Sequence, residues 1–212
     1  MWLTFLAVVV VSFATLIFMR PVAEKVGLID KPNFRKRHQG FIPLIGGIAL
    51  FLGTLTFYAF QADTLPLPGL YLLSMTILLI IGVLDDRFDI SPALRAGIQA
   101  ILAGAMIYSG LELESLGQII APFSIKLGFF SLIFTVFITI GVINAFNMVD
   151  GIDGLLAGLS SVSFAGIGAL MWINQEHAIA YWCLAIILTL IPYAMFNLSV
   201  FGAKWKVFMG DS

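Results

Sequence analysis

The sequence predicts an all-α fold, a polytopic bundle of about seven transmembrane helices with its N-terminus outside the cell. Of the 212 residues, 60% are hydrophobic and only 11% are charged, and the mean hydropathy is +1.05. Apolar stretches of about 18 residues recur along the chain, each long enough to cross roughly 30 Å of hydrocarbon. This combination indicates an integral membrane protein. We therefore expect a lipid bilayer around the chain and no nucleic-acid partner.

Each predicted span is a helix, because lipid offers backbone N–H and C=O groups no hydrogen-bonding partner. The first apolar stretch is a span rather than a signal peptide, since no basic segment precedes it and Arg20 follows instead of a cleavage site. Ser91 and Pro92 fit the N-cap and first position of the fourth helix. Pro192 could kink the last one. The expected spans are 2–19, 44–61, 69–84, 94–110, 128–146, 155–173 and 178–196.

Basic residues lie almost entirely in alternate connections between these spans. Lys126 alone falls in a connection on the other side. The positive-inside rule therefore places the basic connections in the cytoplasm and the N-terminus outside. The basic side holds Arg20, Lys25, Lys31, Arg35, Lys36, Arg37, Arg87, Lys204 and Lys206, with Arg95 at its boundary.

An acidic cluster, Asp85-Asp86-Arg87-Phe88-Asp89, ends the third predicted span on this cytoplasmic side. Carboxylates at a helix C-terminus face the negative end of the helix dipole, which disfavours them. A nearby cation would offset this cost, and Arg87, Arg95 or a bound metal ion could supply it. The alternative is a solvated turn whose acids simply end the span.

A second polar cluster follows the fifth predicted span. Asn144, Asn147 and Asp150 recur at every third position, and Gly151 and Gly154 allow a tight turn or the close approach of a ligand. Amide and carboxylate oxygens are the hard ligands that Mg²⁺ prefers, together with phosphate oxygens and water. The alternative is an ordinary polar loop. Two spans separate this cluster from the acidic one, so both reach the same membrane face.

A third segment, residues 30–43, is rich in basic side chains. Lys36, Arg37 and His38 lie at its centre. Such a segment anchors the topology and attracts anionic headgroups in any case. It could additionally bind the phosphate of a lipid or nucleotide. Asp211, close to the last residue of the sequence, also falls on the cytoplasmic side, so that all these groups could form one site for a divalent metal and phosphates.

Four segments of the sequence carry these residues in one combination. They are Asp30 to His38 followed by Pro43 and Gly46-Gly47, Asp85-Asp86 with Asp89, Asn144 to Gly154, and Phe208-Met209-Gly210-Asp211. Together they resemble the polyprenyl-phosphate N-acetylhexosamine-1-phosphate transferases. The resemblance implies transfer of N-acetylglucosamine-1-phosphate from UDP-N-acetylglucosamine to undecaprenyl phosphate with Mg²⁺ or Mn²⁺. It also implies release of UMP at the cytoplasmic face of the bacterial inner membrane, at the start of O-antigen or common-antigen lipopolysaccharide synthesis.

The resemblance also implies roles for individual residues. Asp85 and Asp86 match paired acids assigned to catalysis or to the metal region. Asp211 matches a metal-binding aspartate, and we expect Asp86 and Asn147 to share that metal. The expected substrate-binding residues are Arg95, Asn144, Asn147, Asp150, Asp153, Lys36, Arg37 and His38.

The chain differs from the family pattern at its C-terminal end. Family members continue from the glycine and aspartate into several further spans and a cytoplasmic loop rich in His and Arg, whereas Ser212 is the last residue here. The resemblance thus implies that residues 1–212 are one membrane domain, the N-terminal part of a longer fold. A catalytically silent fragment remains an alternative. A transporter piece is another, although transporter sites lie near the bilayer midplane on broken helices. A homo-oligomer also remains open.

Overall fold

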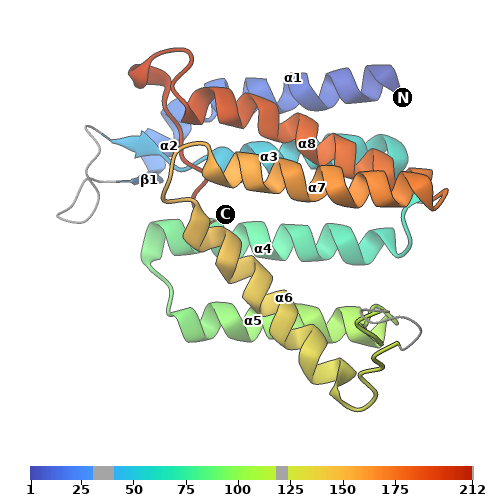
Figure 1. The fold of residues 1–212 in the computed structure, drawn as a ribbon. Coiled ribbons are helices and arrows are strands. Elements are labelled where there is room, and N and C mark those ends of the chain that lie inside the picture. Colours follow the sequence, from blue (N-terminus) through green and yellow to red (C-terminus); the bar gives the residue numbers. More distant parts are fainter. Residues whose placement is uncertain (31–40, 118–123, 212) are drawn as a thin grey trace. The chain divides into compact units, whose positions relative to one another are not determined.

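The computed structural model describes residues 1–30, 41–117 and 124–211, and most of these residues are helical. Every predicted span coincides with a helix (Figure 1). The helices are α1 Trp2–Phe18, α2 Arg20–Val26, α3 Gly46–Gln61, α4 Pro68–Phe88, α5 Pro92–Tyr108, α6 Phe130–Val149, α7 Leu155–Ile173 and α8 His177–Asn197, with short 3₁₀ turns at Ala62–Thr64 and Ala203–Trp205. Strand β1 (Ile29–Asp30) pairs antiparallel with β2 (Ile42–Pro43). The all-α membrane fold is confirmed.

Helix length bears on the number of spans. Among the described helices, α4, α6, α7 and α8 are long and apolar enough to cross a membrane, and α1 with α2 adds one more if the 44° bend between them lies within a single span. Helices α3 and α5 have 16 and 17 residues. A spanning helix usually needs about 20. Seven spans and an outer N-terminus therefore stay predictions.

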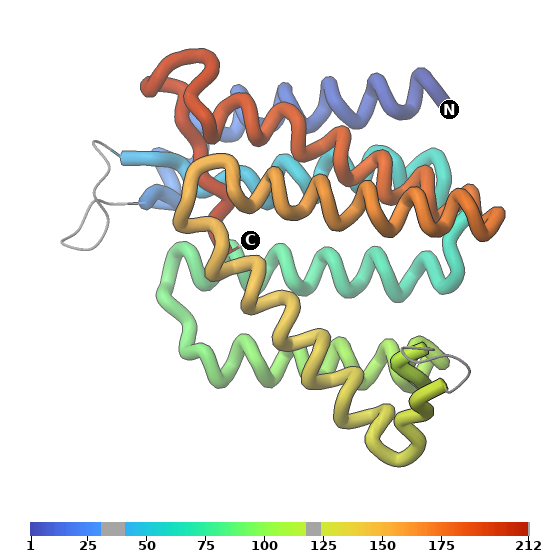
Figure 2. Tube along the Cα trace, viewed as in Figure 1, coloured from blue at the N-terminus to red at the C-terminus, as the bar shows by residue number. Residues whose placement is uncertain are grey.

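The chain forms two compact units. The first contains Met1–Asp89 and Val149–Ser212, and the second contains Ile90–Met148. These units describe packing within the chain, and a single membrane domain over 1–212 stays a prediction. In the first unit α1, α3 and α8 pack on one another and α7 packs on α8, so that segments from opposite ends of the sequence lie side by side (Figure 2).

The core of the first unit combines aromatic rings with small residues. The rings of Phe5 and Phe57 stack with centroids 5.5 Å apart, and Trp182 meets Phe57 edge-on at 4.9 Å. Where Gly53 of α3 faces Thr189 of α8, a Cβ added to the glycine would lie 2.5 Å from the threonine side chain. Small residues at such crossings let helix backbones approach closely, which is how helices associate where lipid is as apolar as the side chains.

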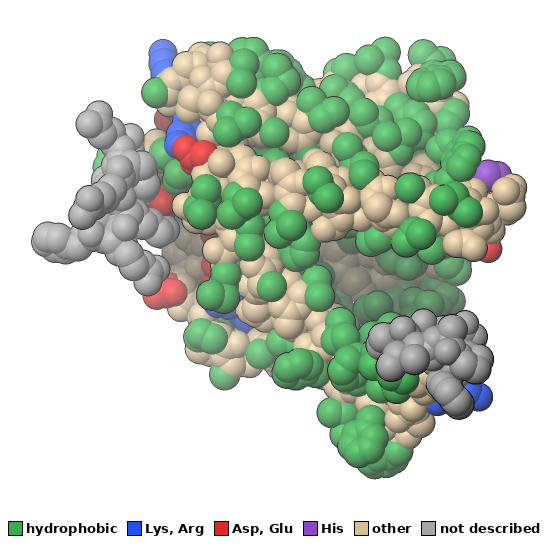
Figure 3. All heavy atoms as spheres, viewed as in Figure 1, with side chains coloured by type: hydrophobic (Ala, Val, Ile, Leu, Met, Phe, Trp, Pro, Cys, Tyr) green, Lys and Arg blue, Asp and Glu red, His purple; other side chains and the backbone are tan. Residues whose placement is uncertain are grey.

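Many large apolar side chains remain on the surface. On α7, Val162 and Ile173 are each 72% exposed. On the face shown in Figure 3, hydrophobic side chains spread along the helices. Exposed apolar side chains along a helix of 19 residues suit contact with lipid chains, and they agree with the membrane class predicted from composition.

Helix α5 of the second unit begins as expected. Ser91 is its N-cap, and the Ser91 hydroxyl accepts a hydrogen bond from the Leu94 amide at 3.4 Å. Pro92 takes the first helical position, where a missing N–H carries no penalty. The predicted Ser-Pro start of this helix is confirmed.

Candidate functional site at the end of α4

The paired acids lie in the last turn of α4. The apolar stretch ends at Leu84, but the helix continues to Phe88 and closes at Asp89, which adopts φ 54° and donates its amide to the Asp85 carbonyl at 2.8 Å. The Asp85 side chain is buried and that of Asp86 is half-buried. The helix thus carries both carboxylates beyond its apolar part, at the end of the helix where the dipole is negative.

Asp86 is bound to the C-terminal segment, defined here as residues 206–211. Its Oδ1 accepts the Asp211 backbone amide at 2.8 Å. Gly210 has φ +81°, and a Cβ added there would lie 2.4 Å from Asp86 Oδ2. Only glycine fits this position, because it tolerates both the left-handed backbone and the close carboxylate.

The second oxygen of Asp86 is buried and has no hydrogen-bond partner within the described part of the chain. The charge of this carboxylate also interacts with those of Asp211, Asp85 and Asp150. Burying an unpaired carboxylate oxygen among other acids is unfavourable unless a cation compensates it. The arrangement therefore fits a site that receives a divalent cation.

The described residues alone do not complete a metal site. No group of three or more His, Cys, Asp or Glu side chains among them is arranged to hold an ion. Mg²⁺ usually takes one or two carboxylates and completes its shell with water and substrate phosphates. Asp86 and Asp211 fit this incomplete kind of shell.

The C-terminal segment is held by backbone pairing with residues far away in sequence. The Phe208 amide donates to the Pro43 carbonyl at 3.0 Å, and the Gly46 and Gly47 amides donate to Phe208 and Met209 at 3.0 and 3.1 Å. A Cβ added at Gly46 would lie 2.7 Å from the Met209 Cα. The glycines that follow the basic segment thus let the C-terminal segment pass next to the start of α3.

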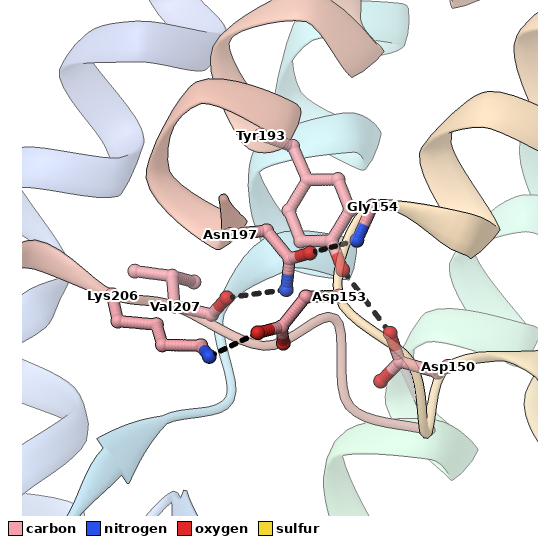
Figure 4. A network of polar contacts seen from close by, with 7 residues as sticks. All are labelled: Asp150, Asp153, Gly154, Tyr193, Asn197, Lys206 and Val207. Atoms are coloured by element: carbon pink, nitrogen blue, oxygen red, sulfur yellow. Dashed lines mark hydrogen bonds and ion pairs between the residues drawn. The ribbon is translucent and has the colours of Figure 1, made fainter. Parts of the chain in front are cut away.

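The loop after α6, residues 150–154, brings two further acids to the first unit; we call it the acidic loop. Asp150 Oδ1 accepts a hydrogen bond from the Tyr193 hydroxyl at 3.1 Å. Asp153 forms an ion pair with Lys206 of the C-terminal segment (Figure 4). The acidic loop and the C-terminal segment are therefore neighbours.

Asn197 bridges these same two segments. Its Oδ1 accepts the Gly154 amide at 2.6 Å, and its Nδ2 donates to the Val207 carbonyl at 3.0 Å (Figure 4). Sequence reasoning did not identify Tyr193, Asn197 or Lys206 as residues of the site. The first two are polar, lie four residues apart on one face of α8, and interrupt an apolar helix, a pattern that could have indicated them.

The remaining predicted residues fall elsewhere. Arg95, Asn144 and Asn147 belong to the second unit, where the Asn144 amide donates to Gln99 Oε1 at 2.9 Å and to the Ile140 carbonyl at 2.8 Å. Lys36, Arg37 and His38 lie outside the described residues. The structure thus brings together five predicted acids in the first unit: Asp85, Asp86, Asp150, Asp153 and Asp211.

Comparison with known proteins identifies the family. The pattern of glycosyl transferase family 4 matches residues 69–212. The undecaprenyl-phosphate alpha-N-acetylglucosaminyl 1-phosphate transferase of Haemophilus influenzae is 59% identical over 203 residues, which are 95% of this chain and 57% of that protein. The protein of the same name from Escherichia coli K12 is 51% identical over 198 residues, 93% and 54% of the two chains. The chain spans about half the length of these relatives. It belongs to glycosyl transferase family 4.

Proposed function

We propose that this member of glycosyl transferase family 4 transfers N-acetylglucosamine-1-phosphate from UDP-N-acetylglucosamine to undecaprenyl phosphate, with release of UMP. The names of its relatives support the transferred N-acetylglucosaminyl 1-phosphate group and the undecaprenyl phosphate acceptor. The observation that carries it is the half-buried, hydrogen-bonded Asp86 beside Asp211, at the end of a membrane-compatible helix. Acids at such a place suit a reaction between a lipid phosphate and a water-soluble nucleotide sugar.

The reaction needs positioning more than proton transfer. An oxygen of the lipid phosphate attacks the sugar-linked phosphorus of UDP-N-acetylglucosamine, and the bond from this phosphorus to the oxygen of UMP breaks. Phosphate monoesters lose their second proton near pH ~6, so the attacking oxygen is already largely ionised at neutral pH. We propose that Asp85 and Asp86 orient the reacting groups, because positioning and charge neutralisation dominate phosphoryl transfer.

Mg²⁺ or Mn²⁺ is the proposed cofactor, held by Asp86 and Asp211 of the first unit. Bound there, it would neutralise charge on the diphosphate and its leaving group. Asp150, Asp153 and Asn144 would bind the nucleotide. The proposed phosphate contacts from basic side chains are those of Arg95, Lys36, Arg37 and His38.

We place this chemistry at the cytoplasmic face of a bacterial inner membrane. The distribution of Lys and Arg along the sequence supports that orientation. The lipid-linked sugar would then begin a surface glycan such as an O-antigen or common antigen.

A radiolabel transfer assay tests the proposal. Membranes holding the protein as its gene encodes it receive UDP-N-acetylglucosamine labelled in the sugar, undecaprenyl phosphate and Mg²⁺. We expect label in the lipid fraction with equal release of UMP, and loss of both in Asp86→Asn. A matched control is Asp63→Asn, which removes an exposed acid beyond the other end of α4, about 30 Å away. Absence of transfer by the folded wild-type protein would reject the function.

A further inference from the structure

We infer that Tyr193 and Asn197 of α8 are positioning residues that set the acidic loop against the C-terminal segment, and this inference rests on the function proposed above. Both side chains are almost completely buried, at 1% and 2% exposure. Asn197 directs its amide at both the acidic loop and the C-terminal segment, and Tyr193 directs its hydroxyl at the acidic loop (Figure 4). Neither has a role in the reaction as described so far.

Asn197 uses both halves of its amide. The carbonyl oxygen holds the Gly154 N–H, and the amino group holds the Val207 carbonyl. Asp153 precedes Gly154 and pairs with Lys206, which precedes Val207. A single side chain therefore fixes the backbone beside each partner of that ion pair, and a buried amide satisfied on both sides is costly to replace.

The acidic loop depends on this support because it lacks regular structure of its own. Residues 150–154 form turns and bends between α6 and α7. Gly154 has φ +75°, and a Cβ added there would lie 2.8 Å from Leu198, the residue after Asn197. The end of α8 thus determines how the loop enters α7.

Tyr193 acts one helical turn earlier on the same face of α8. Its hydroxyl donates to Asp150 Oδ1, and its ring edge would meet a Cβ at Gly46 at 2.8 Å. The ring is thus wedged against the start of α3 while the hydroxyl restrains one oxygen of Asp150. A carboxylate held in this way keeps a defined direction toward a cation or nucleotide.

Two substitutions distinguish a role in aligning the acidic loop from a general role in folding. Tyr193→Phe keeps the wedged ring and removes only the hydroxyl, and Asn197→Asp keeps an acceptor for Gly154 but loses the donor to Val207. Tyr181→Phe removes a hydroxyl twelve residues earlier on α8, about 18 Å away, and Asn174→Asp changes an exposed amide at the end of α7. These two serve as matched controls.

The measurements are kcat, KM for UDP-N-acetylglucosamine and the Mg²⁺ concentration for half-maximal transfer, made on the protein as its gene encodes it. Tyr193→Phe should lower kcat about tenfold, since hydrogen bonds to charged groups are among the stronger ones. It should also shift the Mg²⁺ requirement upward, with excess Mg²⁺ restoring part of the rate. A purely structural role would lower the amount of folded protein without moving the Mg²⁺ requirement. A wild-type kcat and Mg²⁺ curve in Tyr193→Phe would overturn the inference while leaving the function intact.

Hydrogen exchange tests the same inference without activity. Peptides covering 150–158 and 206–211 should exchange faster in Asn197→Asp than in wild type and be unchanged in Asn174→Asp. Unchanged exchange in Asn197→Asp would overturn the inference. Failure of wild-type transfer would reject the proposed function, and exchange would then still decide whether Asn197 joins the two segments.

Discussion

Gly210→Ala is the most sharply defined perturbation that the structure offers. Gly210 has φ +81°, and a Cβ at this position would lie 2.4 Å from Asp86 Oδ2. The backbone next to it carries the Asp211 amide that donates to Asp86. Adding one methyl group therefore strains the backbone and displaces a proposed catalytic carboxylate at the same time.

The two effects have different magnitudes and different readouts. A non-glycine residue in the left-handed region costs about 1–2 kcal/mol, which lowers the free energy of unfolding. The added Cβ would push the Asp86 carboxylate away and weaken its hydrogen bond to Asp211, and a bond to a charged group contributes roughly 1.5–3 kcal/mol. If that bond aligns the site for transfer, the rate should fall roughly tenfold to a hundredfold.

Gly202→Ala is the control that carries only the first effect, the backbone strain. Gly202 has φ +92° in the same unit, but no atom lies within 4 Å of an added Cβ. Both variants should unfold at a lower temperature than wild type, Gly210→Ala by more because it also disturbs the Asp86–Asp211 contact, whereas only Gly210→Ala should lose sugar-phosphate transfer in the radiolabel assay. Equal transfer rates in the two variants would refute the role of the Asp86–Asp211 contact.

Three further predictions concern charge, topology and chain length. Loss of one acidic charge should slow transfer roughly a hundredfold, as expected for a lost contact of about 3 kcal/mol, in each of Asp85→Asn, Asp86→Asn, Asp150→Asn and Asp211→Asn. Added Mg²⁺ should partly restore the rate where the substituted residue is a direct metal ligand. Near-normal rates in all four variants would exclude the proposed site. In a Cys183→Ala background, a single cysteine at Gln61 should react with an impermeant thiol reagent from outside, and one at Ala203 should react only after the membrane is opened. The reverse labelling pattern would show that the predicted topology is inverted. Residues 1–212 alone should enter the membrane without catalysing transfer, because they match only 57% of the Haemophilus influenzae relative; UMP release equal to that of a chain extended to the family length would contradict this.

The sequence predicted the helices well because hydrophobic length is a local property. It placed their ends less accurately where polar residues continue a helix. Helix α4 runs through Asp85 and Asp86 to Phe88, since each added residue still completes a backbone hydrogen bond once the chain leaves the apolar part. Helix α6 likewise continues to Val149 and includes Asn147.

The contacts of the site were predictable only in part. Charge distribution placed Asp86, Asp150 and Asp211 on one membrane face, and all three fall in one compact unit. The pairing of residues 206–211 with Pro43–Gly47 could not be predicted, because hydropathy does not encode which distant backbone will donate to which. Tyr193 and Asn197 were missed for a related reason, since a polar residue in an apolar helix reveals its partner only in three dimensions.

The final prediction concerns the energetic cost of the site itself. Asp86 lies at the negative end of α4 among other acids, with one buried oxygen unpaired in the described part of the chain. Each of these features lowers stability when no cation is bound. Asp86→Asn keeps an acceptor for Asp211 and removes the charge, so it should unfold at a higher temperature than wild type in the presence of a chelator.

Magnesium should reverse that order. A ligand that binds only the folded state adds stability in proportion to the logarithm of its concentration over Kd, so Mg²⁺ should raise the unfolding temperature of wild type and have little effect on Asp86→Asn. Asp63→Asn should respond to Mg²⁺ as wild type does, since it changes total charge equally at an exposed position. An Asp86→Asn protein that is less stable than wild type in chelator, or equally stabilised by Mg²⁺, would show that Asp86 is held for folding rather than for a cation.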